Sequence, residues 1–422
     1  MPVFILSKIR QYKTIFFNTF YLSIIEFIKL VMPLIALPYI IKVVGVNKYG
    51  MIVFAQSVVA YFSIVVNFGI DILAVKRVAE NRERKSEIEK VIGGVLIIKG
   101  ALFLLMLCLF TLLILIWGEA RNHALLFYFA FLACLTEVIF VPWLFQGLEE
   151  MSFITFIKST SILIYVGLLL LLIHRAQDYV YIPLLQSGSL LVVSMIGFLY
   201  MWFWKGFHAV NPGWRYIWTF FKGSFPMFLS RGSVIINNNM GKIVAGICLG
   251  TSEVAILDLA QKIIWFALTP GAMLNQAIYP HNARTKNRKT ATRLLFLAVA
   301  FSLVVTGAIV IAAPYLVDFL GHGKLQEAVP LLRFFSPFIV IGTLSTYLGT
   351  PLLVAWGYPK PFNDSVFIST GILLFCYSLL YLTSIGSLKT LVVILMLAEA
   401  TILLYRGWYC LKFRLINFQV SS

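Results

Sequence analysis

Charged side chains stand inside apolar stretches of this chain that are long enough to cross a membrane. A charge at the centre of a membrane-spanning helix costs about 2.5–3.5 kcal/mol on insertion scales, so each needs a wet cavity or an ion-pair partner. The chemistry that such residues offer is binding of polar or charged solutes and ions. The set comprises Lys29, Lys99, Arg231, Lys242, Lys262 and Arg333, with Glu26, Glu137, Asp258 and Glu399 as acidic companions and Asp71 at the end of one stretch.

Glu26, Lys29 and Arg231 form the most specific pattern. Glu26 and Lys29 are three residues apart and share one helix face. An internal repeat with an offset of 205 residues relates position 26 to position 231. Glu26 and Arg231 therefore occupy equivalent depths with opposite charge. We expect them to act across a central cavity as a gate or as a substrate clamp.

Two further groups extend the predicted cavity. Asp258 and Lys262 are four residues apart on one helix face, so they either neutralise each other or line the cavity. Three consecutive asparagines, 237–239, precede Lys242 in another apolar stretch. The predicted cavity residues are Glu26, Lys29, Arg231, Asn238, Lys242, Asp258, Lys262 and Arg333.

The elements that must position these residues are membrane helices. The chain is 60% hydrophobic and 12% charged, whereas soluble domains are about 45–50% apolar and about 25% charged. The apolar runs do not alternate as barrel strands do, so helices are the only way to satisfy their backbone in lipid. We predict an all-α polytopic membrane protein with about twelve spans: 15–43, 48–71, 92–117, 123–145, 153–173, 180–204, 221–248, 253–279, 294–320, 326–354, 363–384 and 388–411.

The sequence contains an internal repeat. Gly45 and Ala55-Gln56 recur 205 residues later as Gly250 and Ala260-Gln261, and 205 is close to half of 422. We predict two pseudo-symmetric six-helix lobes around a central cavity. Their predicted bounds are 1–204 and 221–422, with a cytoplasmic linker at 205–220.

Basic residues indicate the orientation. One set of connecting segments holds 22 of them and the other set holds 6, so the positive-inside rule places both termini in the cytoplasm. Arg406 is counted with the C-terminal basic segment, and Lys99, near a span end, is expected to snorkel to the surface. The two most basic loops, 76–90 and 281–293, either set the topology or dock a phosphate headgroup. The predicted cytoplasmic mouth comprises Asp71, Lys76, Arg77 and Arg284.

Several function classes find no support in the sequence. The net charge is +17, and the basic residues that cause it lie mostly in the predicted loops of a membrane protein. Nucleic acid is therefore not expected as a partner. The five cysteines stand singly in apolar runs, which predicts neither a metal site nor a disulfide framework. The N-terminal apolar run is too long for a cleavable signal peptide. There is no P-loop pattern, so ATP is not expected to supply the energy directly. We expect no cofactor and no catalytic residues.

Short motifs resemble a known family of membrane proteins. The chain is similar to O-antigen (Wzx-type) flippases of the multidrug/oligosaccharidyl-lipid/polysaccharide exporter superfamily, whose fold is MATE-like. The resemblance covers essentially the whole chain. The motifs that carry it are Pro38-Tyr39, Gly45, Tyr49-Gly50, Phe54-Ala55, Asn67-Phe68-Gly69, Ala74, the run 142–149 (PWLFQGLE), Ala260, Pro270, Ala277, Pro280 and Gly357-Tyr358-Pro359-Lys360.

The resemblance implies a function. Proteins of this branch move undecaprenyl-diphosphate-linked oligosaccharide from the cytoplasmic to the periplasmic leaflet of the bacterial inner membrane, and a cationic cavity suits the diphosphate. We expect alternating access, a monomer in the bilayer and contact with polysaccharide polymerase machinery. Coupling to H⁺ or Na⁺ through Glu26, Asp71, Asp258 or Glu399 stays open.

Two alternatives remain. A multidrug or cation exporter of the same superfamily would be expected to carry net acidic charge in its spans, and the spans here carry a small basic surplus. A membrane polysaccharide polymerase or ligase usually has a large periplasmic loop, and the predicted periplasmic connections are short.

The pairing of Glu26 with Arg231 is testable by charge exchange. Glu26→Arg and Arg231→Glu should each abolish transport, because each places like charges at one level of the cavity. The double exchange should restore part of the transport, measured as surface polysaccharide in a strain that lacks the native protein. A double variant as inactive as either single one would reject the pairing.

Overall fold

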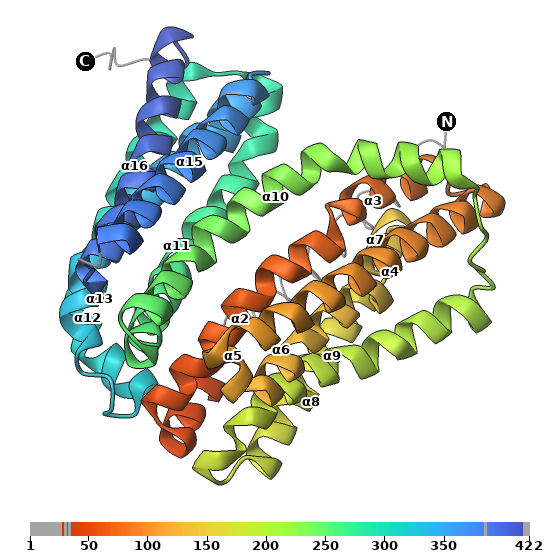
Figure 1. The fold of residues 1–422 in the computed structure, drawn as a ribbon. Coiled ribbons are helices and arrows are strands. Elements are labelled where there is room, and N and C mark those ends of the chain that lie inside the picture. Colours follow the sequence, from red (N-terminus) through yellow and green to blue (C-terminus); the bar gives the residue numbers. More distant parts are fainter. Residues whose placement is uncertain (1–27, 29–31, 33–34, 384–385, 417–422) are drawn as a thin grey trace. The chain divides into compact units, whose positions relative to one another are not determined.

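The computed structural model describes residues 28, 32, 35–383 and 386–416, and helices dominate this part of the chain (Figure 1). The first half contains α2 (Val46–Asn67), α3 (Ile70–Glu80), α4 (Lys85–Ile116), α5 (Gly118–Asn122), α6 (Ala124–Ile139), α7 (Pro142–Gly147), α8 (Met151–Leu172), the short helices η1 (Ala176–Val180) and η2 (Tyr200–Trp204), and α9 (Tyr181–Leu199). The second half contains α10 (Trp214–Cys248), α11 (Thr251–Thr285), α12 (Arg288–Gly321), α13 (Ala328–Phe335), α14 (Phe338–Tyr347), η3 (Leu348–Val354), α15 (Pro359–Thr383) and α16 (Leu388–Lys412).

Ten described helical segments are long and apolar enough to cross a membrane, some of them built from two consecutive helices. The predicted first span, 15–43, falls mostly outside the described residues, and its end is seen as the apolar helix Ile35–Val44. The predicted seventh span corresponds to α10, which is 35 residues long. The asparagines 237–239, Arg231 and Lys242 lower the hydropathy of α10, which explains why it is not among the ten.

Local sequence explains where the helices begin and end. The side chains of Asn287 and Ser387 cap α12 and α16 by accepting the backbone N–H groups of Thr290 and Thr390. Pro142 opens α7, where its missing N–H costs nothing. The segment 205–213 is not helical, so α10 begins inside the stretch that the sequence predicts as a linker.

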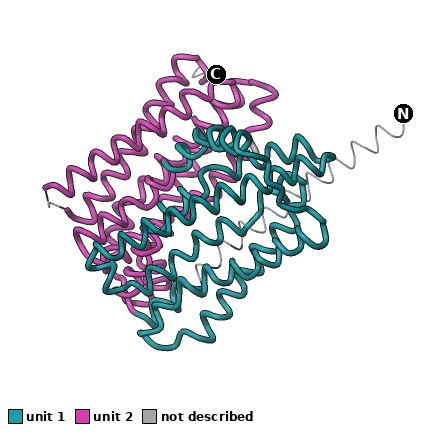
Figure 2. Tube along the Cα trace, turned by 45° about the vertical axis from the view of Figure 1, so that its right-hand side comes forward, with its two compact units in different colours: residues 1–44, 58–232 teal, residues 45–57, 233–422 magenta. Residues whose placement is uncertain are grey.

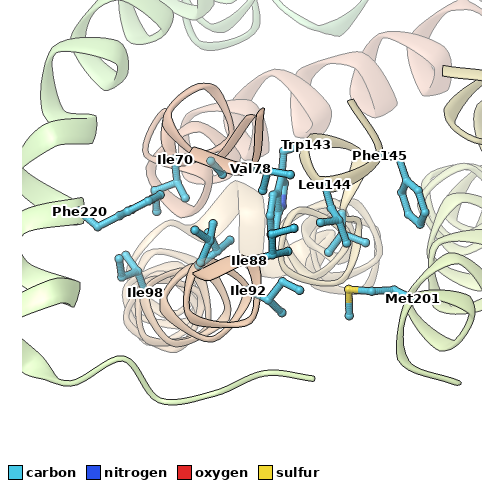
Figure 3. Close-up of a cluster of buried hydrophobic side chains, with 14 of the residues drawn as sticks. Ile70, Val78, Ile88, Ile92, Ile98, Trp143, Leu144, Phe145, Met201 and Phe220 are labelled. Carbon is cyan, nitrogen blue, oxygen red and sulfur yellow. The ribbon is translucent and has the colours of Figure 1, made fainter. Parts of the chain in front are cut away.

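The described chain divides into two compact units, Met1–Val44 with Val58–Gly232 and Gly45–Ser57 with Ser233–Ser422 (Figure 2). One boundary lies just before α2, one inside α2 and one inside α10. The first unit has a core of residues from α3, α4 and α7, in which Trp143 lies among Val78, Ile88 and Leu144 (Figure 3). Burying such side chains on several helices fixes how the helices pack.

A break between α2 and α3 shapes the first unit. Phe68 and Gly69 both have positive φ, of 48° and 67°, so the chain turns there instead of continuing one straight helix. A side chain at position 69 would also meet the backbone of Met227 and Phe228 in α10. The break places Asn67 and Asp71 on either side of the turn.

The second unit includes the start of α2, which packs against the start of α11. Gly45 and Gly250 precede these helices with φ of 84° and 124°, so both copies of the repeated glycine occupy a conformation that favours glycine. The hydroxyl of Ser252 donates to the side-chain oxygen of Asn47, a residue 205 positions earlier. Repeat-equivalent positions thus contact each other here.

Gly50 is the tightest point of this junction. A Cβ atom at position 50 would overlap the backbone carbonyl oxygen of Thr251. The helix backbone of α11 moves only at a cost of about 1–3 kcal/mol, as for other overpacked sites.

We expect Gly50→Ala to lower the melting temperature and the yield of monodisperse protein in detergent. Gly100→Ala is the matched control, since nothing lies within 4 Å of a Cβ there and alanine favours the helix. Equal stability of the two variants would show that the junction is not a close contact.

Candidate functional site

The first unit contains a buried ionic network. The Lys99 Nζ lies 2.6 Å from the Asp71 Oδ1 and donates to the backbone oxygen of Glu137 at 2.9 Å. The Asn67 side-chain amide is within 2.8 Å of both the Asp71 Oδ2 and the Glu137 Oε2. The hydroxyl of Ser63 also donates to Glu137, at 3.2 Å. Residues from α2, α3, α4 and α6 thus share one polar cluster.

The side chain of Lys99 is completely buried. The prediction that Lys99 snorkels to the surface is therefore wrong. A sequence position near the end of an apolar run suggests an exit to water, but Asp71 provides a partner in the interior. Forming this ion pair replaces the water that the ammonium group loses.

A pocket of about 450 Å³ opens beside this network. Asn67, Asp71 and Glu137 line it together with Lys158 and Arg231. The Arg231 Nη1 lies 3.4 Å from the Asn67 Oδ1, and Arg231 is exposed. Because Lys99 already neutralises Asp71, the pocket offers two cations against one further carboxylate, Glu137. This arrangement suits an anionic or mixed polar group.

The second unit has its own ionic cluster, centred on Asp258. Lys242 lies 2.7 Å from the Asp258 Oδ1, and Lys262 lies 2.7 Å from the Oδ2. The Tyr49 hydroxyl donates to the same carboxylate and accepts from Lys262 at 2.7 Å. Asp258 is only 2% exposed. Asp258 and Lys262 therefore form an ion pair, which was one of the two interpretations of their spacing. Lys242 forms a second ion pair with the same carboxylate.

A second pocket, of about 410 Å³, lies within the second unit. Arg406 and Glu399 of α16 line it and share Ser345 as an anchor. The Ser345 hydroxyl donates to Glu399, and its backbone oxygen accepts from the Arg406 Nη1 at 2.8 Å. The Arg406 Nε donates to Ser365 at 2.9 Å. These contacts hold both charged groups in fixed positions.

Arg406 is the main residue that the sequence interpretation missed. It is 5% exposed, whereas counting placed it with the C-terminal basic segment. That assignment is wrong because α16 continues to Lys412, so that Arg406 lies within the helix and not after it. Its guanidinium is inside the second unit, 4.4 Å from the centroid of the Phe362 ring. Its position inside the predicted span 388–411 was the available signal.

The predicted site residues fall into separate places. Glu26 and Lys29 lie outside the described residues, so their pairing with Arg231 stays a prediction. Asn238 lines the pocket of the second unit. Arg333 lies on an exposed face of α13, where its Nε donates to the backbone oxygen of Val310 at 3.3 Å. Asp71, predicted at the cytoplasmic mouth, belongs to the network of the first unit.

The other predicted mouth residues lie on exposed helix ends. Lys76 forms a long ion pair with Glu80, at 3.9 Å, and both side chains are exposed. Arg77 lies in the last turn of α3 and Arg284 in the last turn of α11. They do not line either described pocket.

The two basic loops differ in their acidic neighbours. Near the first loop, Arg82 pairs with Glu149 at 2.7 Å and also donates to the backbone oxygen of Gly147. The hydrogen bond from Arg82 holds the pKa of the Glu149 carboxyl below its usual value. The segment 281–293 contains five basic residues and no acidic one. The second loop therefore has no acidic residue of its own to balance its basic residues.

Among the residues that the structure describes, no group of three or more His, Cys, Asp or Glu side chains is placed to hold a metal ion. What the two pockets offer is binding through charges, amides and hydroxyls.

A sequence model of the polysaccharide biosynthesis proteins matches residues 15–286. The chain belongs to this family. Two family relatives share the name "Putative O-antigen transporter". The one from Escherichia coli (strain K12) is 25% identical over 377 residues, which cover 84% of this chain and 87% of the relative. The one from Shigella dysenteriae is 22% identical over 357 residues, covering 83% and 89%.

Solved structures with the same fold are transporters. An inward-facing multidrug resistance MATE family transporter of the MOP superfamily has a TM-score of 0.69 at 16% identity, covering 93% of this chain and 96% of the neighbour. The lipid II flippase MurJ in an inward closed conformation has a TM-score of 0.69 at 13% identity, covering 92% and 86%. The predicted all-α, MATE-like membrane fold is thereby confirmed for this polysaccharide biosynthesis protein.

The Lys99–Asp71 pair predicts a strong stability effect. Lys99→Met leaves the Asp71 carboxylate buried without its cation, which should cost about 3–5 kcal/mol. We expect a lower melting temperature of the detergent-solubilised protein and partial recovery in Lys99→Met with Asp71→Asn. Lys76→Met is the control, because the Lys76 side chain is 70% exposed. Equal melting temperatures for Lys99→Met and Lys76→Met would contradict the role of the pair.

Proposed function

We propose that this protein is a flippase that moves undecaprenyl-diphosphate-linked oligosaccharide, an O-antigen or related surface polysaccharide unit, from the cytoplasmic to the periplasmic leaflet. The observation that carries the proposal is the similarity along most of the chain to two proteins named as O-antigen transporters. Membership of the polysaccharide biosynthesis family supports the same substrate class.

The described geometry is compatible with such a substrate. A lipid-linked oligosaccharide presents a charged diphosphate and many hydroxyl groups to a protein that must carry both through apolar surroundings. Each unit has a polar pocket lined by membrane-spanning helices, and each ionic cluster is internally paired. Pairing lowers the cost of placing these charges among apolar helices.

In this proposal Arg231 and Lys158 in the pocket of the first unit attract the diphosphate. Among the residues that the structure describes, Arg231 makes one long hydrogen bond, to Asn67. Guanidinium groups bind phosphate oxygens through two parallel hydrogen bonds, which favours Arg231 for this task. The five basic residues of segment 281–293 would draw the phosphate to the membrane surface first.

Further expectations belong to the same proposal. The protein works as a monomer by alternating access in the bacterial inner membrane, with both termini cytoplasmic, and it meets polysaccharide polymerase machinery on the far side. Asp71, Asp258 and Glu399 are the described carboxylates through which H⁺ or Na⁺ would couple to transport.

The deciding experiment locates the substrate in cells that lack this protein. We expect lipid-linked oligosaccharide to accumulate and to stay protected from an external sugar-modifying reagent, while surface polysaccharide is lost. The physical reason is that the glycan cannot cross the hydrocarbon layer without a polar path. Returning the wild-type gene should restore the surface polysaccharide and remove the accumulated lipid-linked oligosaccharide. The Arg231→Gln variant should restore less surface polysaccharide.

Accumulation on the periplasmic side would place the block after flipping. That result would favour a polymerase or ligase and reject the flippase. A strain with normal surface polysaccharide and raised sensitivity to organic cations would instead favour a drug exporter.

A further inference from the structure

The pocket of the second unit has a chemistry of its own. Its walls come from α10, α11, α14, η3, α15 and α16, and its volume of about 410 Å³ lies in the range of small-molecule sites. Polar and aromatic side chains meet there, among them Asn238, Asn275, Trp265, Glu399 and Arg406.

The charges of this pocket balance. Arg406 and Glu399 are the two charged residues in its lining, and both are held by Ser345. A balanced pair gives no net attraction for a diphosphate or for an organic cation. The preferred ligand is therefore uncharged, and it binds through hydrogen bonds.

Several hydrogen-bonding groups of the pocket lack a partner among the described residues. The Asn275 side chain is 5% exposed, and its Nδ2 is buried without an acceptor. A buried amide without a partner is costly, and proteins keep such groups mainly where a ligand or water completes them. One Glu399 oxygen accepts from Ser345, so the other is available, and two hydrogen bonds to protein use only part of the five N–H donors of Arg406.

An aromatic side chain adds a second kind of contact. Trp265 lines the pocket, and its ring centroid lies 5.4 Å from that of Phe338. Trp265 lies on α11, and its contacts with Phe335 of α13 and Phe338 of α14 keep the indole in place. A sugar ring combines an apolar C–H face, which suits an indole, with hydroxyls that both donate and accept. The donors, acceptors and ring of this pocket match those two properties.

We infer that this pocket is a subsite for one neutral sugar residue, a hexose or an N-acetylhexosamine, of the oligosaccharide. The inference rests on the proposed function and adds to it a site that recognises the glycan separately from the diphosphate. Asn275 and Asn238 bind the hydroxyl or acetamido groups, Glu399 and Arg406 bind the hydroxyls between them, and Trp265 supports the ring.

The test compares two lipids on the purified full-length protein. One is undecaprenyl diphosphate, and the other is the undecaprenyl-diphosphate-linked oligosaccharide extracted from cells that lack this protein. Binding is measured in lipid nanodiscs. We expect the wild type to bind the glycosylated lipid more tightly. Asn275→Leu and Asn238→Leu should each weaken that binding about threefold to tenfold, as the loss of one hydrogen bond predicts, and leave binding of undecaprenyl diphosphate unchanged.

The melting temperature of each variant shows whether weaker binding comes from a lost ligand contact or from a destabilised fold. Replacing an unpartnered buried amide by an apolar group of similar shape is neutral or favourable for the unliganded protein, so Asn275→Leu should not lower its melting temperature. Asn239→Leu is the matched control on α10. Its amide donates to the backbone oxygen of Ile235, and it does not line the pocket. It should bind both lipids as the wild type does.

Two outcomes overturn the inference in different ways. If the wild type prefers the glycosylated lipid and both pocket variants keep the full preference, the sugar binds elsewhere and the flippase proposal stands. If the wild type binds neither lipid better than phosphatidylglycerol, the proposed function fails and the subsite fails with it.

Discussion

The structure depends on one constraint, that a charge placed among apolar helices needs a partner close by. Asp71 meets this constraint through Lys99 and Asn67, and Asp258 meets it through Lys242, Lys262 and Tyr49. Each cluster joins helices that are distant in sequence. The ion pairs therefore neutralise charge and also determine which helices stand together.

Two positions of the predicted 205-residue repeat have matching features, whereas the two pockets differ. Gly45 and Gly250 both have positive φ just before a helix, and the side chain of Asn47 contacts that of Ser252. The pockets differ. The first unit gathers Asp71, Glu137, Lys158 and Arg231, whereas the second balances one arginine against one glutamate. The two units thus offer different chemistry to whatever enters their pockets.

Neighbouring acidic residues also change what the basic residues do. Around the first basic loop, Arg82 is fixed by Glu149 and by the end of α7, so it ties two segments together. Segment 281–293 has five basic residues and no acidic residue of its own. Arg82 of the first loop therefore has a structural role that its count among the basic residues does not reveal.

The sequence by itself determined the class of fold, because long apolar runs in lipid admit helices and the 205-residue repeat marks equivalent positions. It also showed that Asp258 and Lys262 share a face, since a spacing of four is local geometry. Tertiary structure alone decided that Lys99 is buried beside Asp71, that Lys242 joins Asp258, and that Arg406 and Glu399 share Ser345. Those contacts join different helices. Hydropathy and residue spacing describe only one helix at a time, so they could not predict them.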